Sequence, residues 1–324
     1  MRILTWIKPT WDIHIWNYFW ALEPLVRLSH TYPKADIFSF VPNMHALTSF
    51  HDPIGIKKNT INWVKIALAC GVDPERYFIY SQSDIAAHAQ LTRVLSCLTH
   101  MWFMERMHVY KDAIAKGTQH DISVGTFTYP ILMAVDILLY DTTHVPVGQD
   151  QKQHIEYARD IAQKFNNMYG ETFVLPEAIV QEDVAVVPWI DGRKMSKSYN
   201  NVLSFVDTEK TILKKIKQIP TETKTVEEPK DPDVCNVYNI TKLFLTPTED
   251  EALRRKYQAW WLSYKVAKEY LFEKIIDFMK PIQAKFETIS DEYVIELLKK
   301  NAPRAWAIAE QKVQDVYKKI WFTL

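Results

Sequence analysis

The residues best suited to chemistry form a basic, hydroxyl-rich segment at 194–198, which reads KMSKS. Two ammonium groups and two hydroxyls on one loop can hold a triphosphate, and they bind it more tightly as charge develops on departing pyrophosphate. An ordinary solvated basic loop is the alternative for these residues taken alone. The segment predicts a nucleoside-triphosphate site in which Lys194 and Lys197 supply the positive charge.

A second polar segment follows the first predicted strand, Arg2–Trp6. It contains Lys8 and Thr10, and His14 then stands at the start of a predicted helix. A strand, a polar turn and a helix N-terminus form a phosphate cradle, because the free N–H groups of the helix point at the ligand. We expect Thr10 and His14 to donate to phosphate oxygens, although a single histidine is more often structural.

A carboxylate interrupts the apolar helix predicted at 130–140. Tyr129, Met133, Asp136 and Tyr140 share one helical face by their spacing of three and four residues. An acid on an apolar face is costly unless a donor meets it. An indole N–H only donates, so a carboxylate is its natural partner. Asp136 therefore predicts a site for an N–H donor, and a structural, ion-paired aspartate is the alternative.

The next segment, at 144–154, reads HVPVGQDQKQH. Val145 and Val147 offer apolar walls to a ligand, and Gly148 allows close approach of the backbone. The polar residues 149–151 then open a predicted helix. We expect them to face a ribose or an ammonium group.

These residues need a scaffold of alternating strands and helices. The apolar runs predict strands at Arg2–Trp6, Asp36–Val41, 77–82 and 185–188, and helices at 17–29, 58–70, 85–98, 101–116, 130–140 and 149–165. Such alternation indicates βαβ units and a parallel sheet. Residues 219–232 read as a loop, and the pattern is helical from 236 onward. We expect an α/β fold: a Rossmann-like catalytic domain with a helical insertion, followed by an all-α domain.

The composition limits the classes of protein. The 324 residues have a formal net charge of zero, so nucleic-acid contacts must come from local basic patches. Cys70, Cys97 and Cys235 are isolated, which indicates neither disulfides nor a zinc site. The early charged residues exclude a signal-peptide core, and no apolar run is long enough to span a membrane. We expect a soluble cytoplasmic protein.

Taken together, these segments resemble the bacterial-type tryptophanyl-tRNA synthetases, which are class I aminoacyl-tRNA synthetases. The resemblance covers nearly the whole chain, through residues 3–22, 45–48, 129–165, 191–201 and 235–244. It implies a Rossmann catalytic domain at 1–205, a helical tRNA-binding domain at 206–324 and a homodimer. It also implies ATP with Mg²⁺ as a substrate complex, and no metal held by protein ligands.

The family's motifs also imply particular site residues. The tryptophan site would consist of Leu4, Tyr129, Met133, Asp136, Val145, Val147 and Gln151, with Asp136 accepting the indole N–H. The ATP site would consist of Lys8, Pro9, Thr10, His14, Trp16, Asn17, Gly148, Gln149, Asp150, Val186, Lys194, Met195, Ser196, Lys197 and Ser198. Catalytic roles would fall to Thr10, His14, Lys194 and Lys197. The implied reaction forms tryptophanyl-adenylate and pyrophosphate, and then loads tRNA(Trp).

The sequence departs from the family by carrying Trp where the family has Gly. This holds at positions 6, 11, 16, 20, 102, 189, 260, 261 and 321, and the chain has only seven glycines. Gly serves such turns through positive φ and close backbone approach, and Trp offers neither. Our hypothesis is that UGA codons meaning Gly were translated as Trp. We expect crowding of the ATP cradle by the Trp side chains as written.

Two other functions remain open from the sequence. A tyrosyl-tRNA synthetase shares the fold, but it would favour a polar residue at Met133 to meet a phenol hydroxyl. A catalytically inactive RNA-binding paralogue would explain a filled ATP cradle. It would have no reason to keep the segment at 194–198 together with Asp136 and Gln151.

Overall fold

The computed structural model describes residues 1–6, 14–148, 152–180, 202–222, 224–259 and 262–322. The chain forms two compact units. Unit 1 contains Met1–Trp11, Ala21–Glu182 and Ile289–Leu324, and unit 2 contains Asp12–Trp20 and Asp183–Thr288.

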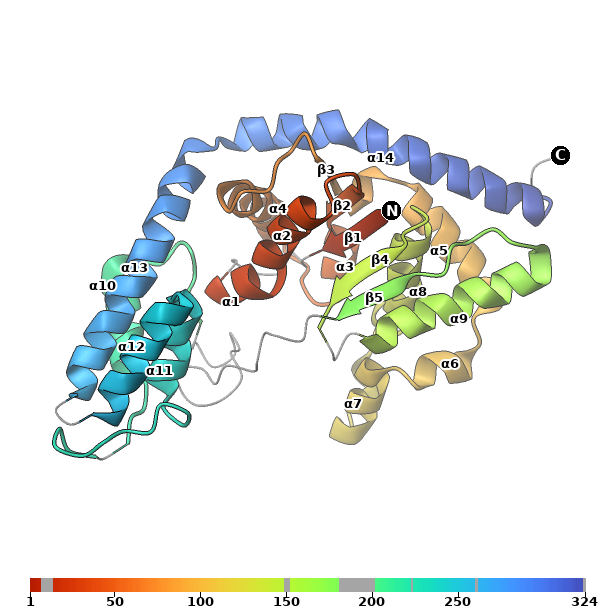
Figure 1. The fold of residues 1–324 in the computed structure, drawn as a ribbon. Coiled ribbons are helices and arrows are strands. Elements are labelled where there is room, and N and C mark those ends of the chain that lie inside the picture. The colour runs from red at the N-terminus through yellow and green to blue at the C-terminus, as the bar shows by residue number, and fades with distance from the viewer. Residues whose placement is uncertain (7–13, 149–151, 181–201, 223, 260–261, 323–324) are drawn as a thin grey trace. The chain divides into compact units, whose positions relative to one another are not determined.

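Unit 1 is built on a parallel sheet of five strands (Figure 1). The strands are β1 (Arg2–Trp6), β2 (Asp36–Val41), β3 (Tyr77–Ser81), β4 (His144–Val147) and β5 (Glu177–Val180). They lie in the order β3-β2-β1-β4-β5, and every pair is parallel. Strands of such sheets are buried on both faces, which explains the mostly apolar runs of β1 and β2. The predicted Rossmann-like parallel sheet is confirmed.

Helices connect these strands and form the predicted insertion. They are α2 (Glu23–Thr31), α3 (Asn43–Ala46), α4 (Pro53–Ala69), α5 (Ala87–Leu98), α6 (Met101–Glu105), α7 (His108–Lys116), α8 (Val124–Leu138) and α9 (Lys152–Tyr169). Their apolar faces build one hydrophobic core together with the sheet. The core includes the side chains of Leu4, Phe38 and Tyr140, none of which has exposed surface.

Most predicted boundaries hold within a few residues. The strands expected at Arg2–Trp6 and Asp36–Val41 are confirmed. Strand β3 ends one residue earlier than expected, because Gln82 begins a short 3₁₀ helix, η2 (Gln82–Asp84). The prediction of a single helix at 101–116 was wrong, because the chain forms two helices there, α6 and α7, with the buried Met107 between them. The strand expected at 185–188 lies outside the described residues.

Unit 2 is helical in its described residues, apart from connecting loops and a β-bridge between His14 and Ser204. It contains α1 (Ile15–Asn17), the start of a π-helix, η1 (Tyr18–Leu22), and the helices α10 (Glu209–Lys217), α11 (Asn236–Thr241), α12 (Pro247–Gln258) and α13 (Tyr264–Thr288). Aromatic side chains hold these segments together: Phe278 of α13 packs against Tyr18, Phe19 and Phe244 at ring distances of 4.8–5.8 Å.

The last helix, α14 (Asp291–Lys319), belongs to unit 1. Lys312 of α14 lies 2.6 Å from the carboxylate of Asp141 and donates to the carbonyl oxygen of Thr172 at 2.8 Å. The expected domain 206–324 therefore includes a helix that packs in unit 1. Its assignment as a tRNA-binding domain stays a prediction.

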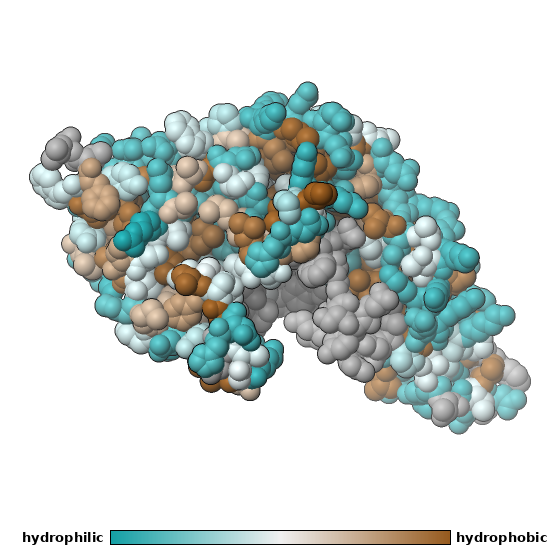
Figure 2. Space-filling model, turned by 180° about the vertical axis from the view of Figure 1, so that it is seen from behind, coloured by the Kyte–Doolittle hydropathy of each residue, from teal (hydrophilic) through white to brown (hydrophobic). Residues whose placement is uncertain are grey.

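The surface of unit 1 carries an apolar groove of about 900 Å³ between α4 and α14. Figure 2 shows brown, apolar side chains near the upper edge of the molecule, where α14 runs in Figure 1. The described residues around the groove include none of the predicted site residues. Among the helices of the described ranges, none is both long and apolar enough to cross a membrane.

Candidate active site

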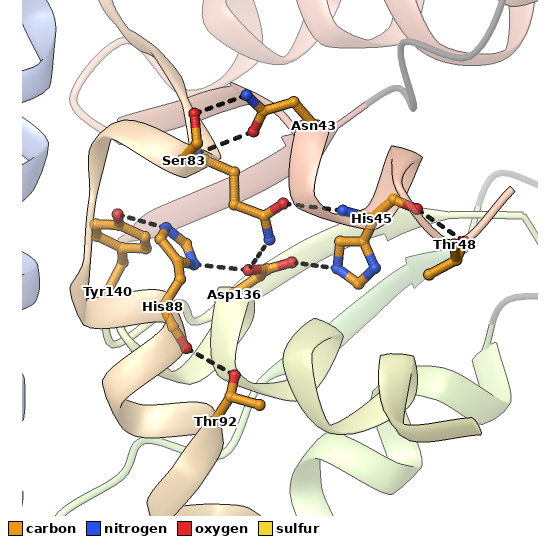
Figure 3. Close-up of polar contacts among 9 residues, drawn as sticks. Asn43, His45, Thr48, Ser83, His88, Thr92, Asp136 and Tyr140 are labelled. Carbon is orange, nitrogen blue, oxygen red and sulfur yellow. Dashed lines mark hydrogen bonds and ion pairs between the residues drawn. The ribbon is translucent and has the colours of Figure 1, made fainter. Parts of the chain in front are cut away.

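Asp136 of α8 is the centre of a buried polar cluster in unit 1 (Figure 3). Its Oδ1 accepts hydrogen bonds from Gln82 Nε2 and His88 Nδ1, both at 2.7 Å. Its Oδ2 lies 2.9 Å from His45 Nε2. Asp136, Gln82 and His88 have no exposed surface, and His45 is 7% exposed. Such a cluster satisfies an acid that would otherwise be costly to bury.

The sheet explains why these four side chains meet. His45 lies in α3, soon after the carboxyl end of β2, and Gln82 directly follows β3. The carboxyl ends of parallel strands lie at one edge of the sheet, which is where open α/β folds place their sites. Helix α8 presents Asp136 to this edge, and the start of α5 presents His88.

A second pair of hydrogen bonds ties these two turns together. Asn43 Nδ2 donates to Ser83 Oγ at 2.7 Å, and the Ser83 backbone N–H donates to Asn43 Oδ1 at 3.0 Å (Figure 3). The backbone N–H of His45 also points to Gln82 Oε1 at 3.4 Å. The amide of Gln82 is therefore held at both ends, so its N–H is directed to Asp136.

The donors decide the charge of Asp136. Burial alone would raise the pKa of this carboxyl, but the hydrogen bonds and the electrostatic attraction of His45 and His88 together outweigh burial and hold the pKa below its ordinary value. Asp136 is therefore an anion at neutral pH. An anionic carboxylate can only accept hydrogen bonds, so the cluster presents an acceptor of fixed direction.

The predicted amino-acid residues lie around this cluster or in the core beneath it. Met133 is buried one turn before Asp136. The Tyr129 ring is half-buried and lies 6.2 Å from the ring of His45, and burial raises its pKa. Leu4 and Val145 are fully buried on the neighbouring strands β1 and β4. Two predicted members remain: Val147 is half-buried at the end of β4, and Gln151 lies outside the described residues.

Few of the predicted ATP residues can be placed. The His14 backbone N–H donates to Asn17 Oδ1 at 3.0 Å, which caps the start of α1 in unit 2. In unit 1, Gly148 directly follows β4. For Trp16, only the backbone is placed. The remaining predicted ATP residues lie outside the described residues: Lys8, Pro9, Thr10, Gln149, Asp150, Val186, Lys194, Met195, Ser196, Lys197 and Ser198.

Sequence reasoning missed Gln82 and His88, and it gave His45 no role although that residue lies in a recognised segment. The available signal was weak: a polar pair, Gln82 and Ser83, directly after the apolar run of β3, and a histidine six residues later. Among the described residues, no group of His, Cys, Asp or Glu is arranged to hold a metal ion.

The tryptophans at expected glycine positions differ in their surroundings. Trp6 is half-buried and packs on Phe40 at a ring distance of 5.8 Å, and Trp102 is largely exposed. Trp321 follows α14 with φ +61°, and its neighbour Phe322 donates its backbone N–H to the Tyr317 carbonyl oxygen at 2.9 Å. This is the left-handed helix end that Gly normally occupies. The crowding expected around Trp11, Trp16 and Trp189 falls on residues or side chains outside the described ones.

Comparisons with known proteins agree on one family. The sequence profile of the class I tRNA synthetases for tryptophan and tyrosine (W and Y) matches residues 1–280. The chain is 42% identical over 322 residues to a tryptophan–tRNA ligase of Campylobacter jejuni, covering 99% of each chain. It is 41% identical to that of Fusobacterium nucleatum, covering 97% of this chain and 95% of that one.

Solved structures give the same result. The crystal structure of tryptophanyl-tRNA synthetase from Campylobacter jejuni complexed with ADP and tryptophan superposes with a TM-score of 0.89, at 42% identity and 99% coverage of both chains. The enzyme from Mycoplasma pneumoniae has a TM-score of 0.82 at 30% identity, covering 98% of this chain and 97% of that one.

Proposed function

Because the chain belongs to the class I tRNA synthetases for tryptophan and tyrosine, we infer that it is a tryptophan–tRNA ligase. It activates L-tryptophan with ATP to give tryptophanyl-adenylate and pyrophosphate, and then transfers the tryptophanyl group to tRNA(Trp). The tyrosine-specific and inactive alternatives are not favoured, since the full-length relatives described above are tryptophan enzymes.

The observation that carries the substrate is the buried, anionic Asp136. Each carboxylate oxygen can accept about two hydrogen bonds. Oδ1 already accepts two, from Gln82 and His88, whereas Oδ2 has His45 as its single donor among the described residues. Oδ2 can therefore accept the indole N–H of tryptophan. The buried thioether of Met133 supports this choice, because it offers no polar group to a phenol hydroxyl.

The rest of the amino-acid site is proposed from the resemblance and from the positions of the described residues. Leu4, Met133, Val145 and Val147 would contact the indole ring with apolar atoms. Tyr129 would hold the amino-acid head together with Gln151. The fact that Tyr129 and Asp136 both contact His45 supports one shared pocket, because it brings the two ends of the α8 face to the same side chain.

The ATP site is likewise a proposal. Lys8, Thr10, His14 and Asn17 would bind the triphosphate, and Gly148 would let the nucleotide approach the backbone after β4. Lys194 and Lys197 would bind the leaving pyrophosphate with Mg²⁺ that arrives as part of the substrate complex. Positioning and charge stabilisation would supply most of the rate, since the reaction needs no covalent enzyme intermediate.

We further propose that the enzyme works as a homodimer in the cytoplasm, as the resemblance implies. Charging of tRNA tests the inferred function. A purified version with Gly at positions 6, 11, 16, 20, 102, 189, 260, 261 and 321 should aminoacylate a tRNA(Trp) transcript with tryptophan in the presence of Mg-ATP, and it should leave a tRNA(Tyr) transcript uncharged with tyrosine. Charging with tyrosine, or charging with neither amino acid by this folded Gly version, would overturn the inference.

A further inference from the structure

Behind Asp136, a hydrogen-bonded pair extends the cluster away from His45 (Figure 3). We propose that His88 and Tyr140 are positioning residues for tryptophan recognition: Tyr140 fixes the ring of His88, and His88 fixes Oδ1 of Asp136, so that Oδ2 is aimed at the indole N–H. This inference rests on the proposed function, because it takes Asp136 as the indole acceptor.

The order of donors follows from the chemistry of the three groups. Asp136 is an anion and only accepts, so the proton of His88 lies on Nδ1, 2.7 Å from Asp136 Oδ1. A neutral imidazole with its proton on Nδ1 has an acceptor at Nε2. The hydroxyl of Tyr140 lies 3.2 Å from Nε2 and donates to it. The two hydrogen bonds then run in the same sense: Tyr140 donates to His88, and His88 donates to Asp136.

The surroundings of His88 hold its ring in place. Its side chain has no exposed surface, and three aromatic rings lie around it: Phe40 at 5.9 Å, Tyr80 at 6.1 Å and Tyr140 at 5.8 Å. These rings come from β2, from β3 and from the turn that follows α8, so three separate segments fix one imidazole. A ring flip would break both hydrogen bonds inside a region that water does not reach.

The two carboxylate oxygens consequently have different roles. Oδ1 is held by two side chains that are themselves fully buried, Gln82 and His88. Oδ2 contacts His45, whose side chain keeps some exposed surface. A carboxylate fixed through one oxygen presents the other at a constant angle. Fixed acceptors of this kind discriminate strongly against ligands that lack the matching N–H.

The groups facing Asp136 also determine how it titrates. They are His45 from α3, Gln82 from η2 and His88 from α5, with Tyr80 of β3 and Tyr140, two residues after α8, behind them. Burial raises the pKa of Tyr80 and of Tyr140, so both stay neutral. Without the His88 donor, burial would act on Asp136 with less opposition and its pKa would rise.

The experiment compares four variants by ATP–pyrophosphate exchange, each made in the version of the chain with Gly at the nine Trp positions. Tyr140→Phe removes only the hydroxyl, and His88→Leu removes both ring nitrogens. His88→Asn returns an N–H donor close to the position of Nδ1. Thr92→Val is the matched control, because Thr92 Oγ1 donates to the carbonyl oxygen of His88 without touching its ring or Asp136. Each variant is assayed with tryptophan and with benzothienylalanine, in which sulfur replaces the indole N–H.

We expect the KM for tryptophan to rise about fivefold in Tyr140→Phe and about 100-fold in His88→Leu, with partial rescue in His88→Asn and no change in Thr92→Val. The KM for ATP should not move. Preference for tryptophan over benzothienylalanine should shrink in the same order. In His88→Leu, the KM for tryptophan should also rise as the pH falls, because a carboxyl with a raised pKa becomes protonated and stops accepting.

The outcomes separate this proposal from the proposed function. If the parent version with Gly uses tryptophan and Tyr140→Phe and His88→Leu match Thr92→Val, the positioning roles are wrong and the function stands. If the folded parent version uses no tryptophan, both proposals are overturned. Should His88→Leu fail to fold, Tyr140→Phe still decides the result. In addition, ¹⁵N spectra of labelled histidine must show His88 protonated at Nδ1 and not at Nε2; the opposite tautomer overturns the proposal.

Discussion

His45 Nε2 lies 2.9 Å from Asp136 Oδ2, whereas Gln82 and His88 both donate to the other carboxylate oxygen, Oδ1. This contact puts a histidine at the place where we propose that the indole N–H binds. The same imidazole lies 6.2 Å from the ring of Tyr129, which we propose to hold the amino-acid head. His45 therefore connects both ends of the proposed amino-acid site.

Replacing Asp136 by Asn should impair tryptophan use. The amide keeps one acceptor oxygen and points an NH₂ group at donors that already face the site, so a charged hydrogen bond is lost and a buried donor is left unpaired. We expect kcat/KM for tryptophan to fall about 100-fold. Asp112→Asn, an exposed change on α7, should leave the kinetics unchanged. Normal tryptophan kinetics in Asp136→Asn would contradict the proposed role.

The lowered pKa of Asp136 predicts how stability depends on pH. A carboxyl whose folded-state pKa is depressed stabilises the fold above its unfolded pKa, about 3.9, and that contribution disappears as the pH falls through the folded pKa. The difference in melting temperature between the unchanged chain and Asp136→Asn should therefore be constant at neutral pH and shrink below about pH 4. A difference that stays constant down to pH 2 would contradict it.

Trp321→Gly should stabilise the protein. Trp321 adopts φ +61° and is 82% exposed, so it pays the cost of a left-handed conformation and buries little. Gly117 after α7 and Gly170 after α9 take positive φ at the same kind of helix end. We expect the free energy of unfolding to rise by about 1 kcal/mol, as measured with denaturant.

The matched control for this change is Trp306→Gly. Trp306 is also partly exposed on α14, but it lies inside the helix, where Gly costs about 1 kcal/mol. The two substitutions should therefore change stability in opposite directions. Destabilisation by both would mean that the left-handed position at 321 suits Trp.

The codons of the gene should distinguish the Trp residues at expected Gly positions from the other Trp residues. Our hypothesis predicts UGA at positions 6, 11, 16, 20, 102, 189, 260, 261 and 321, and UGG at Trp63 and Trp306. The structure supports part of this division: Trp63 is fully buried, as a genuine core tryptophan would be, whereas Trp321 has a backbone typical of Gly. UGG throughout would contradict the hypothesis, and the codons can be read directly by sequencing the gene.

The sequence predicted the parts of the fold that depend on local pattern. Strands β1 and β2 are mostly apolar runs, and both have the expected bounds. Asp136 was recognisable because it is an acid on an apolar helix face, and burial in a parallel α/β unit makes such an acid exceptional. Tyr140 was placed on the same face, and it joins the cluster through His88.

The remaining features depend on long-range packing, which local patterns do not contain. Gln82 and His88 meet Asp136 across 54 and 48 residues of sequence, so no spacing within one helix could reveal them. Helix α14 is amphipathic like its neighbours, and its long-range contacts, among them those of Lys312 with Asp141 and Thr172, show that it belongs to unit 1. Much of the predicted ATP site, including the segment 194–198, lies outside the described residues and stays a prediction.

ATP–pyrophosphate exchange tests the central claim most directly. It should be measured with tryptophan and with tyrosine, on the chain as written and on a version with Gly at the nine Trp positions named above. We expect exchange with tryptophan and not with tyrosine, and we expect the version with Gly to be the active one. Exchange by the chain as written would show that the cradle tolerates Trp. A folded Gly version that shows no exchange with tryptophan, or that exchanges with tyrosine instead, would contradict the assignment.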